Sequence, residues 1–79
     1  GNAIKILAYP NPVISTVTIS GIQAGDVLVV TNNEGKVIRS VNVNANTYEL
    51  PMQQLGSGVY NIAVLRNQQR VGNTTVVKQ

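Results

Sequence analysis

The stretch Leu55-Gly-Ser-Gly-Val-Tyr-Asn-Ile-Ala-Val-Leu65 is the most strand-like part of this chain. A turn with two glycines leads into a run in which Tyr60, Ile62 and Val64 stand at every second position. Because successive side chains of a β-strand point to opposite faces of the sheet, these three residues predict the buried face of a core strand. Ser57, between the two glycines, has no histidine in the chain that could activate it as a nucleophile. The stretch is therefore interpreted as structural, and it directs the fold class towards β.

Six further strands are predicted from apolar runs that are separated by turn signals about every ten residues. The run Val27–Val30 is continuously apolar, which predicts a central strand covered on both faces. In the next strand, a bulge near Arg39 and Ser40 is needed to place Ile38 and Val41 on one face. The strands are expected at residues 4–9, 16–20, 26–31, 36–43, 47–50, 58–65 and 70–78.

The segment Tyr9-Pro10-Asn11-Pro12 interrupts this pattern. Proline has no backbone N–H and restricts the residue before it, so two prolines in four residues prevent regular strand pairing. We therefore expect the chain to make a kinked crossover after the first strand.

Seven short strands without a helix of useful length are typical of an all-β fold, a seven-stranded antiparallel immunoglobulin-like β-sandwich. A five- or six-stranded open barrel is the alternative. The 79 residues predict one domain, residues 1–79, in which residues 1–3 are interpreted as linker residues or residues left over from cloning. The chain has no cysteine, so apolar packing and backbone hydrogen bonds must stabilise a thin core.

Charge and hydropathy argue against two classes of partner. The net charge is +3, but the six basic residues are spread along the chain and the only aromatic residues are three tyrosines. Nucleic-acid binding usually requires a clustered basic face, often with exposed aromatic side chains, so we expect no nucleic-acid partner. The longest apolar run is far shorter than the ~20 residues of a membrane-spanning helix, so we expect no membrane insertion.

The chain offers little chemistry for catalysis or metal binding. It contains no histidine or cysteine, and its only carboxylates, Asp26, Glu34 and Glu49, lie in three different predicted elements. No sequence spacing pairs them for acid–base catalysis. The oxygen-rich run 32–35 resembles a calcium loop only superficially and is predicted to be a hairpin turn with Gly35 at a positive φ angle. We therefore expect no catalytic residue, no metal ligand and no cofactor, and predict that the domain is not an enzyme.

Four segments together carry a more specific signal than any of them alone. They are Tyr9-Pro10-Asn11-Pro12 with Val17–Gly21, then Asn33–Ile38, then Leu55-x-x-Gly58-Val59-Tyr60, and finally Val76-Val77-Lys78-Gln79. In this order and spacing, from about Leu7 onward, the chain resembles the C-terminal sorting domains of the type IX secretion system. One departure is Asn61, which is polar where the family often has an apolar or aromatic residue.

This resemblance implies a non-catalytic C-terminal secretion signal. The implied partners are a covalently linked N-terminal cargo domain, the type IX machinery in the periplasm and outer membrane, and a sortase-like protease that removes the domain. The implied localisation is the periplasm in transit and then the cell surface or the extracellular space. Sorting is expected to depend on Val76, Val77, Lys78 and Gln79. The mainly structural motif residues are Tyr9, Pro10, Asn11, Pro12, Gly35, Lys36, Gly58 and Tyr60.

Two further expectations concern strand edges. A terminal strand with an accessible edge can pair with a receptor strand by β-augmentation, with Lys78 attracting the partner by its charge. Exposed edges also predict a weak homodimer. The alternatives to a sorting domain are a surface adhesion or carbohydrate-binding β-sandwich and a structural spacer domain of a multidomain surface enzyme.

Overall fold

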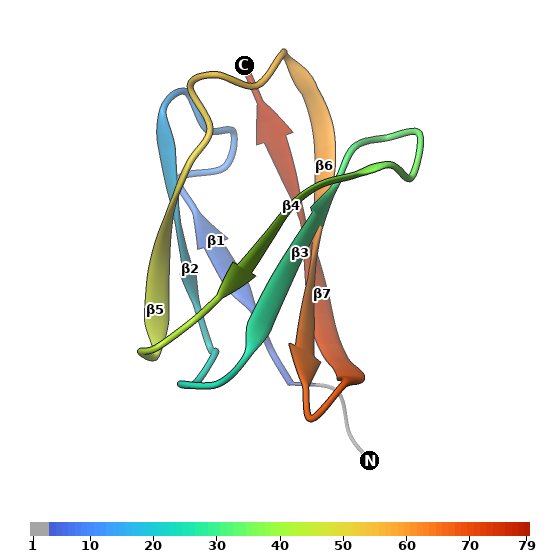
Figure 1. Cartoon of the computed structure of the whole chain (residues 1–79). Helices are drawn as coiled ribbons and strands as arrows, with labels where there is room; N and C mark the ends of the chain where they lie inside the picture. The colour runs from blue at the N-terminus through green and yellow to red at the C-terminus, as the bar shows by residue number, and fades with distance from the viewer. Residues whose placement is uncertain (1–3) are drawn as a thin grey trace.

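The computed structural model describes residues 4–79, which form seven strands in two antiparallel sheets packed face to face (Figure 1). The interpretation of residues 1–3 as linker or cloning residues lies outside the described residues. Residues 4–79 also contain no helix with the length and hydrophobicity of a transmembrane segment. The strands are β1 Leu7–Tyr9, β2 Thr16–Ser20, β3 Val27–Thr31, β4 Val37–Asn42, β5 Thr47–Pro51, β6 Gly58–Arg66 and β7 Gln69–Lys78.

The strand order confirms the predicted immunoglobulin-like sandwich. The first sheet has the order β1-β2-β5, and the second has the order β4-β3-β6-β7. All named strand pairs are antiparallel, and β2 and β3 are consecutive in the chain but belong to different sheets. Such crossing between two sheets is the Greek-key connection of β-sandwiches. The predicted first strand is shortened at its start, because Ile4 instead donates its backbone N–H to the Val71 carbonyl, at 2.8 Å.

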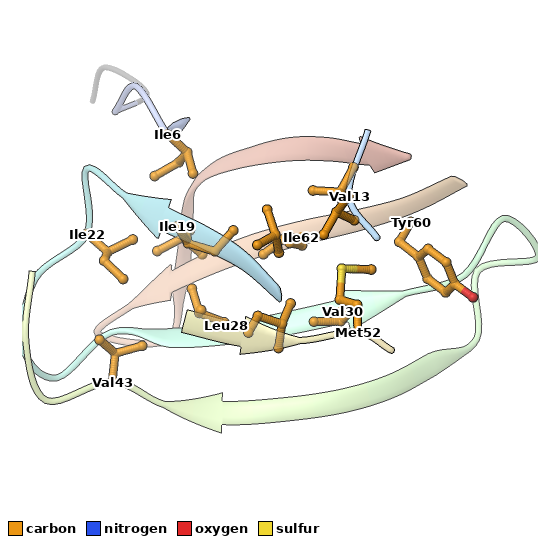
Figure 2. Close-up of a cluster of buried hydrophobic side chains, with 14 residues drawn as sticks. Ile6, Val13, Ile19, Ile22, Leu28, Val30, Val43, Met52, Tyr60 and Ile62 are labelled. Atoms are coloured by element: carbon orange, nitrogen blue, oxygen red, sulfur yellow. The ribbon is translucent and has the colours of Figure 1, made fainter. Parts of the chain in front are cut away.

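The core lies between the two sheets, and β6 supplies its centre. Ile62 and Val64 are fully buried and Tyr60 is only 8% exposed, which confirms the predicted inward face of this strand. β6 pairs with β3 on one side and with β7 on the other, so it is an interior strand of its sheet. Figure 2 shows the cluster that these strands enclose. Its buried members are Ile6, Val13, Val17, Ile19, Ile22, Leu28, Val30, Val43, Leu50, Met52, Tyr60, Ile62, Val64 and Val76.

The prediction that the run Val27–Val30 is covered on both faces is wrong. Leu28 and Val30 point into the core and are fully buried, whereas Val27 and Val29 lie on the outer face and are half-buried. β3 is an interior strand of its sheet, but residues 4–79 place nothing over that outer face except the neighbouring side chains of the sheet. A continuous apolar run indicates that a strand is central without indicating how many faces are covered.

The predicted bulge in β4 is confirmed with a shift of one residue. Val30 pairs with Arg39 and the following Thr31 pairs with Val37, so Ile38 is the extra residue on the bulged strand. This insertion allows Ile38 and Val41 to pack against the same core.

Candidate functional site

Parts of all four motif segments lie at one end of the sandwich, whereas Val17–Gly21 runs along β2 towards the other end. β1 ends at Tyr9 and β7 ends at Lys78, while β6 begins at Gly58, which pairs with Lys78. The β3–β4 hairpin tip, residues 32–36, extends from the same end, as Figure 1 shows at the top of the view together with the C-terminus. We call residues 9–13, 32–36, 56–60 and 76–79 the motif end. Segments that are up to 70 positions apart in the chain thus lie at the same end of the sandwich.

The terminal segment, Val76–Gln79, alternates between buried and exposed residues. Val76 is fully buried and Lys78 is 8% exposed, whereas Val77 is 39% exposed and Gln79 is also exposed. The Lys78 Nζ donates a hydrogen bond to the Gln79 carbonyl, at 2.6 Å. The expectation that Lys78 attracts a partner by its charge is wrong for this conformation, because its side chain is buried against the domain. Only Val77 and Gln79 present their side chains outward.

The outer backbone edge of the terminal segment is occupied by the chain itself. The Asn11 side chain donates from Nδ2 to the Thr75 carbonyl and accepts the Val77 N–H at Oδ1, both at 2.9 Å. Val13 donates its N–H to the Val77 carbonyl at 2.8 Å and accepts the Gln79 N–H at 2.9 Å. The expectation of an accessible edge is therefore wrong for the Thr75 carbonyl, for both backbone groups of Val77 and for the Gln79 N–H. In this conformation a receptor strand finds these backbone groups already bonded.

The opening motif carries the chain from one sheet to the other and back, which confirms the kinked crossover. The Tyr9–Pro10 and Asn11–Pro12 peptide bonds are both cis. After β1, Val13 forms an isolated parallel bridge with Lys78 of the second sheet and is fully buried, and the chain then returns to the first sheet as β2. Sequence analysis missed the contact between the opening and terminal motifs. The bonds of Asn11 span 64 and 66 positions, and no local pattern indicates such a pairing.

The mid-domain motif is a hairpin tip held by one asparagine. The Asn32 Oδ1 accepts the backbone N–H groups of Glu34 at 2.9 Å and Lys36 at 3.0 Å, and Gly35 has the predicted positive φ, +83°. Asparagine side chains commonly stabilise turns in this way, by accepting hydrogen bonds from backbone N–H groups of the residues that follow. Lys36 is exposed beside it. The predicted hairpin is confirmed, and Lys36 is a charged group that the motif end presents to solvent.

The late-strand motif contributes mainly to the fold. The Tyr60 ring lies in the core, and its hydroxyl donates to the Gly56 carbonyl at 2.7 Å. This bond ties the glycine turn to the strand that follows it. Gly58 has a φ of +154°, a backbone conformation that residues other than glycine rarely adopt.

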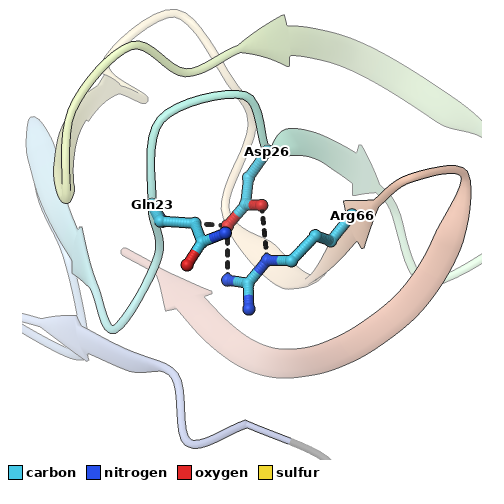
Figure 3. A network of polar contacts seen from close by, with 3 residues as sticks. All are labelled: Gln23, Asp26 and Arg66. Atoms are coloured by element: carbon cyan, nitrogen blue, oxygen red, sulfur yellow. Dashed lines mark hydrogen bonds and ion pairs between the residues drawn. The ribbon is translucent and has the colours of Figure 1, made fainter.

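The opposite end of the sandwich is closed by an ion pair that sequence analysis did not identify. Asp26, directly before β3, is 1% exposed and accepts two hydrogen bonds from Arg66, at 2.8 and 2.9 Å (Figure 3). The backbone N–H of Gln23 donates to the same carboxylate at 2.9 Å. Hydrogen bonding to Arg66 lowers the pKa of Asp26 against the opposing effect of burial. The pairing of Val27 with Leu65 brings the two residues together, 40 positions apart in the chain.

The described residues present few groups for metal binding or acid–base chemistry. Residues 4–79 contain no group of three or more side chains that could hold a metal ion. A hollow of about 170 Å³ is lined by Arg39, Pro51, Gln53 and Gln54, and Arg39 donates to the Pro51 carbonyl there. The hollow offers a guanidinium and two amides but no carboxylate or hydroxyl that could act as an acid, base or nucleophile.

Comparisons with known proteins agree with this geometry. A family model described as a secretion system C-terminal sorting domain matches residues 7–78. The solved structure of PorZ, described as an essential bacterial surface component of the type-IX secretion system of human oral-microbiomic Porphyromonas gingivalis, superposes with a TM-score of 0.83 at 23% sequence identity. The match covers 94% of this chain and 11% of the PorZ chain, so this chain spans about a tenth of that protein. At this identity the likeness shows the fold alone. No protein with a curated description matches the sequence.

Proposed function

The chain belongs to the family of type IX secretion system C-terminal sorting domains, and from this membership we propose that it is the sorting signal of an exported cargo protein. In this proposal residues 1–79 form a single sorting domain without catalytic activity. A cargo domain is linked to its N-terminal side. Type IX sorting delivers proteins to the cell surface or the extracellular space.

The observation that carries the proposal is that each of the four motif segments contributes residues to the motif end of the sandwich. A signal that is recognised on a folded domain must be a surface, and the position of these segments at one end supports the motif end as that surface. Val77 and its cross-strand neighbour Val59 are both exposed on the outer face of the second sheet at this end. Gln79 and Lys36 are exposed there as well. These four side chains are the proposed contacts, whereas Val76 and Lys78 hold the strand in place.

The later steps of export also belong to the proposal. The folded domain binds type IX components in the periplasm and at the outer membrane, and a sortase-like protease removes it at the cell surface. Family membership supports this route. Weak homodimerisation through sheet edges stays a prediction, and it is restricted to edges other than that of residues 77–79, whose outward backbone groups are already bonded.

Reporter fusions in a host with the secretion system test the proposal. An exported reporter is fused to the intact domain, and a second fusion lacks residues 76–79. We expect the intact fusion at the cell surface and the truncated one in the periplasm. Retention of both fusions would contradict the sorting function and favour an adhesion or spacer domain. Because the deletion also removes the buried Val76 side chain, protease resistance of the truncated fusion must show that it is folded.

A further inference from the structure

The last strand carries a segment that is unusually prone to pair with other strands. Residues 73–77, Asn-Thr-Thr-Val-Val, are rich in β-branched side chains and contain no charge and no proline. β7 is also the outermost strand of its sheet, so one side of its backbone faces away from β6. Uncharged segments of this composition on a sheet edge are templates for edge-to-edge association. Two copies that meet antiparallel through residues 73–77 bring no like charges together.

Asn11 occupies this edge in the way that a residue of a neighbouring strand does. A primary amide has a carbonyl acceptor and an N–H donor, the same pair of groups that a peptide unit offers. The Asn11 amide uses both on β7, accepting the Val77 N–H and donating to the Thr75 carbonyl. The Val13 backbone continues the same line of bonds to Val77 and Gln79. One side chain and one residue of backbone thus replace a partner strand.

The two prolines of the motif explain why this substitute strand does not create a new edge. Pro10 and Pro12 have no backbone N–H, so the segment on either side of Asn11 cannot donate to a further strand. An ordinary strand laid against β7 would expose a fresh row of donors and acceptors to solvent. The Asn11 side chain forms hydrogen bonds to β7, while Pro10 and Pro12 have no backbone N–H that could bond to a further strand.

We propose that Asn11 is a strand-mimicking cap that prevents β7 from pairing edge to edge with β7 of a second copy of this chain. This function is independent of the sorting function, because it concerns the purified domain alone. It assigns the opening motif a role beyond the turn that it forms, because the motif keeps the β7 edge from pairing while the terminal segment stays at the surface.

Sedimentation measurements on the 79-residue chain test the cap. We compare the wild type with Asn11→Ala, with Asn11→Ala/Thr75→Lys and with the control Asn46→Ala, which changes an exposed asparagine in the turn before β5. Between about 1 μM and about 1 mM, the wild type and the control should be mainly monomeric and associate equally weakly, whereas Asn11→Ala should form a tighter dimer. A lysine on an edge strand opposes pairing, so Thr75→Lys should restore the monomer. A monomeric Asn11→Ala, or a dimer that persists with Thr75→Lys, would overturn the proposal.

Hydrogen exchange supplies a measurement that does not depend on dimerisation. In the wild type the Val77 amide should exchange within about tenfold of the Val76 amide on the β6-facing side, because both are bonded. In folded Asn11→Ala, measured at low concentration, Val77 exchange should accelerate by about tenfold relative to Val76, the effect of losing one hydrogen bond. If Asn11→Ala does not fold, the wild-type comparison still decides: Val77 exchange a hundredfold faster than that of Val76 would show that the edge is open.

Discussion

Replacing Val76 and Val77 one at a time by threonine tests the alternation of the terminal segment. Threonine keeps the β-branched shape of valine and has a hydroxyl in place of one methyl group. The stability of each variant therefore reports whether the side chain at that position is buried away from water. Val76 is fully buried, and a hydroxyl buried there without a partner costs about 1–3 kcal/mol. Val77 is 39% exposed, and a surface change of this kind stays within about 0.5 kcal/mol.

These free energies translate into separable melting temperatures. In a domain of this size about 1 kcal/mol shifts Tm by roughly 4–8 °C. Val76→Thr should therefore lower Tm by about 4–24 °C, and Val77→Thr by less than about 4 °C. Thermal unfolding followed by circular dichroism measures the shifts, and urea titration with an unchanged m-value checks that both variants unfold from the same native state. Equal destabilisation by the two substitutions, or a larger effect at Val77, would refute the assignment of buried and exposed positions.

Three further predictions concern the fold that presents the motif end. Gly21→Ala should lower the free energy of unfolding, measured by urea titration, by about 2 kcal/mol or more, because φ is +88° and the new Cβ clashes with a backbone carbonyl. Gly25→Ala is the control, since Gly25 has a similar φ of +95° but open space around it, and it should lower the free energy of unfolding by less. Because the pKa of Asp26 is lowered in the folded state, its stabilising effect is present above its unfolded pKa and is lost as pH falls through the folded value. The urea midpoints of wild type and Asp26→Asn should thus converge on acidification, and a constant gap would contradict the effect of Arg66. Gly58→Val should reduce Tm and export together, whereas lost export at wild-type Tm would show that this turn is itself recognised.

Local patterns in the sequence predicted most of the strands and little of their arrangement. Alternation placed Tyr60, Ile62 and Val64 on the core face, and turn chemistry placed the hairpin at Gly35. The run Val27–Val30 did not reveal its exposed face, because four consecutive apolar residues have no alternation. The order of strands within each sheet also had no local signal, since pairing depends on contacts between distant segments.

The candidate site was predicted as residues and not as a surface. The motif residues were predicted as separate segments of the chain, and their position at the same end of the sandwich follows from the strand topology. The bonds of Asn11 to β7 and of Arg66 to Asp26 join residues 40 to 66 positions apart, so no window of sequence contains both partners. The same limit explains the two corrections at the chain end. When only the sequence of the last strand is considered, its outer edge is expected to be open and Lys78 to be exposed. The segment that covers the edge and the packing of Lys78 against the domain become visible only in the folded structure.

Surface delivery of a reporter fused to a Val77→Lys domain is the most direct test of the claim that exposed side chains at the motif end are read. The matched control is Leu7→Lys, which replaces a residue of similar exposure in β1. Both variants must first show Tm values within a few degrees of the wild type. We predict that the Leu7→Lys fusion reaches the cell surface and that the Val77→Lys fusion stays in the periplasm. Wild-type surface delivery of the Val77→Lys fusion would contradict the account.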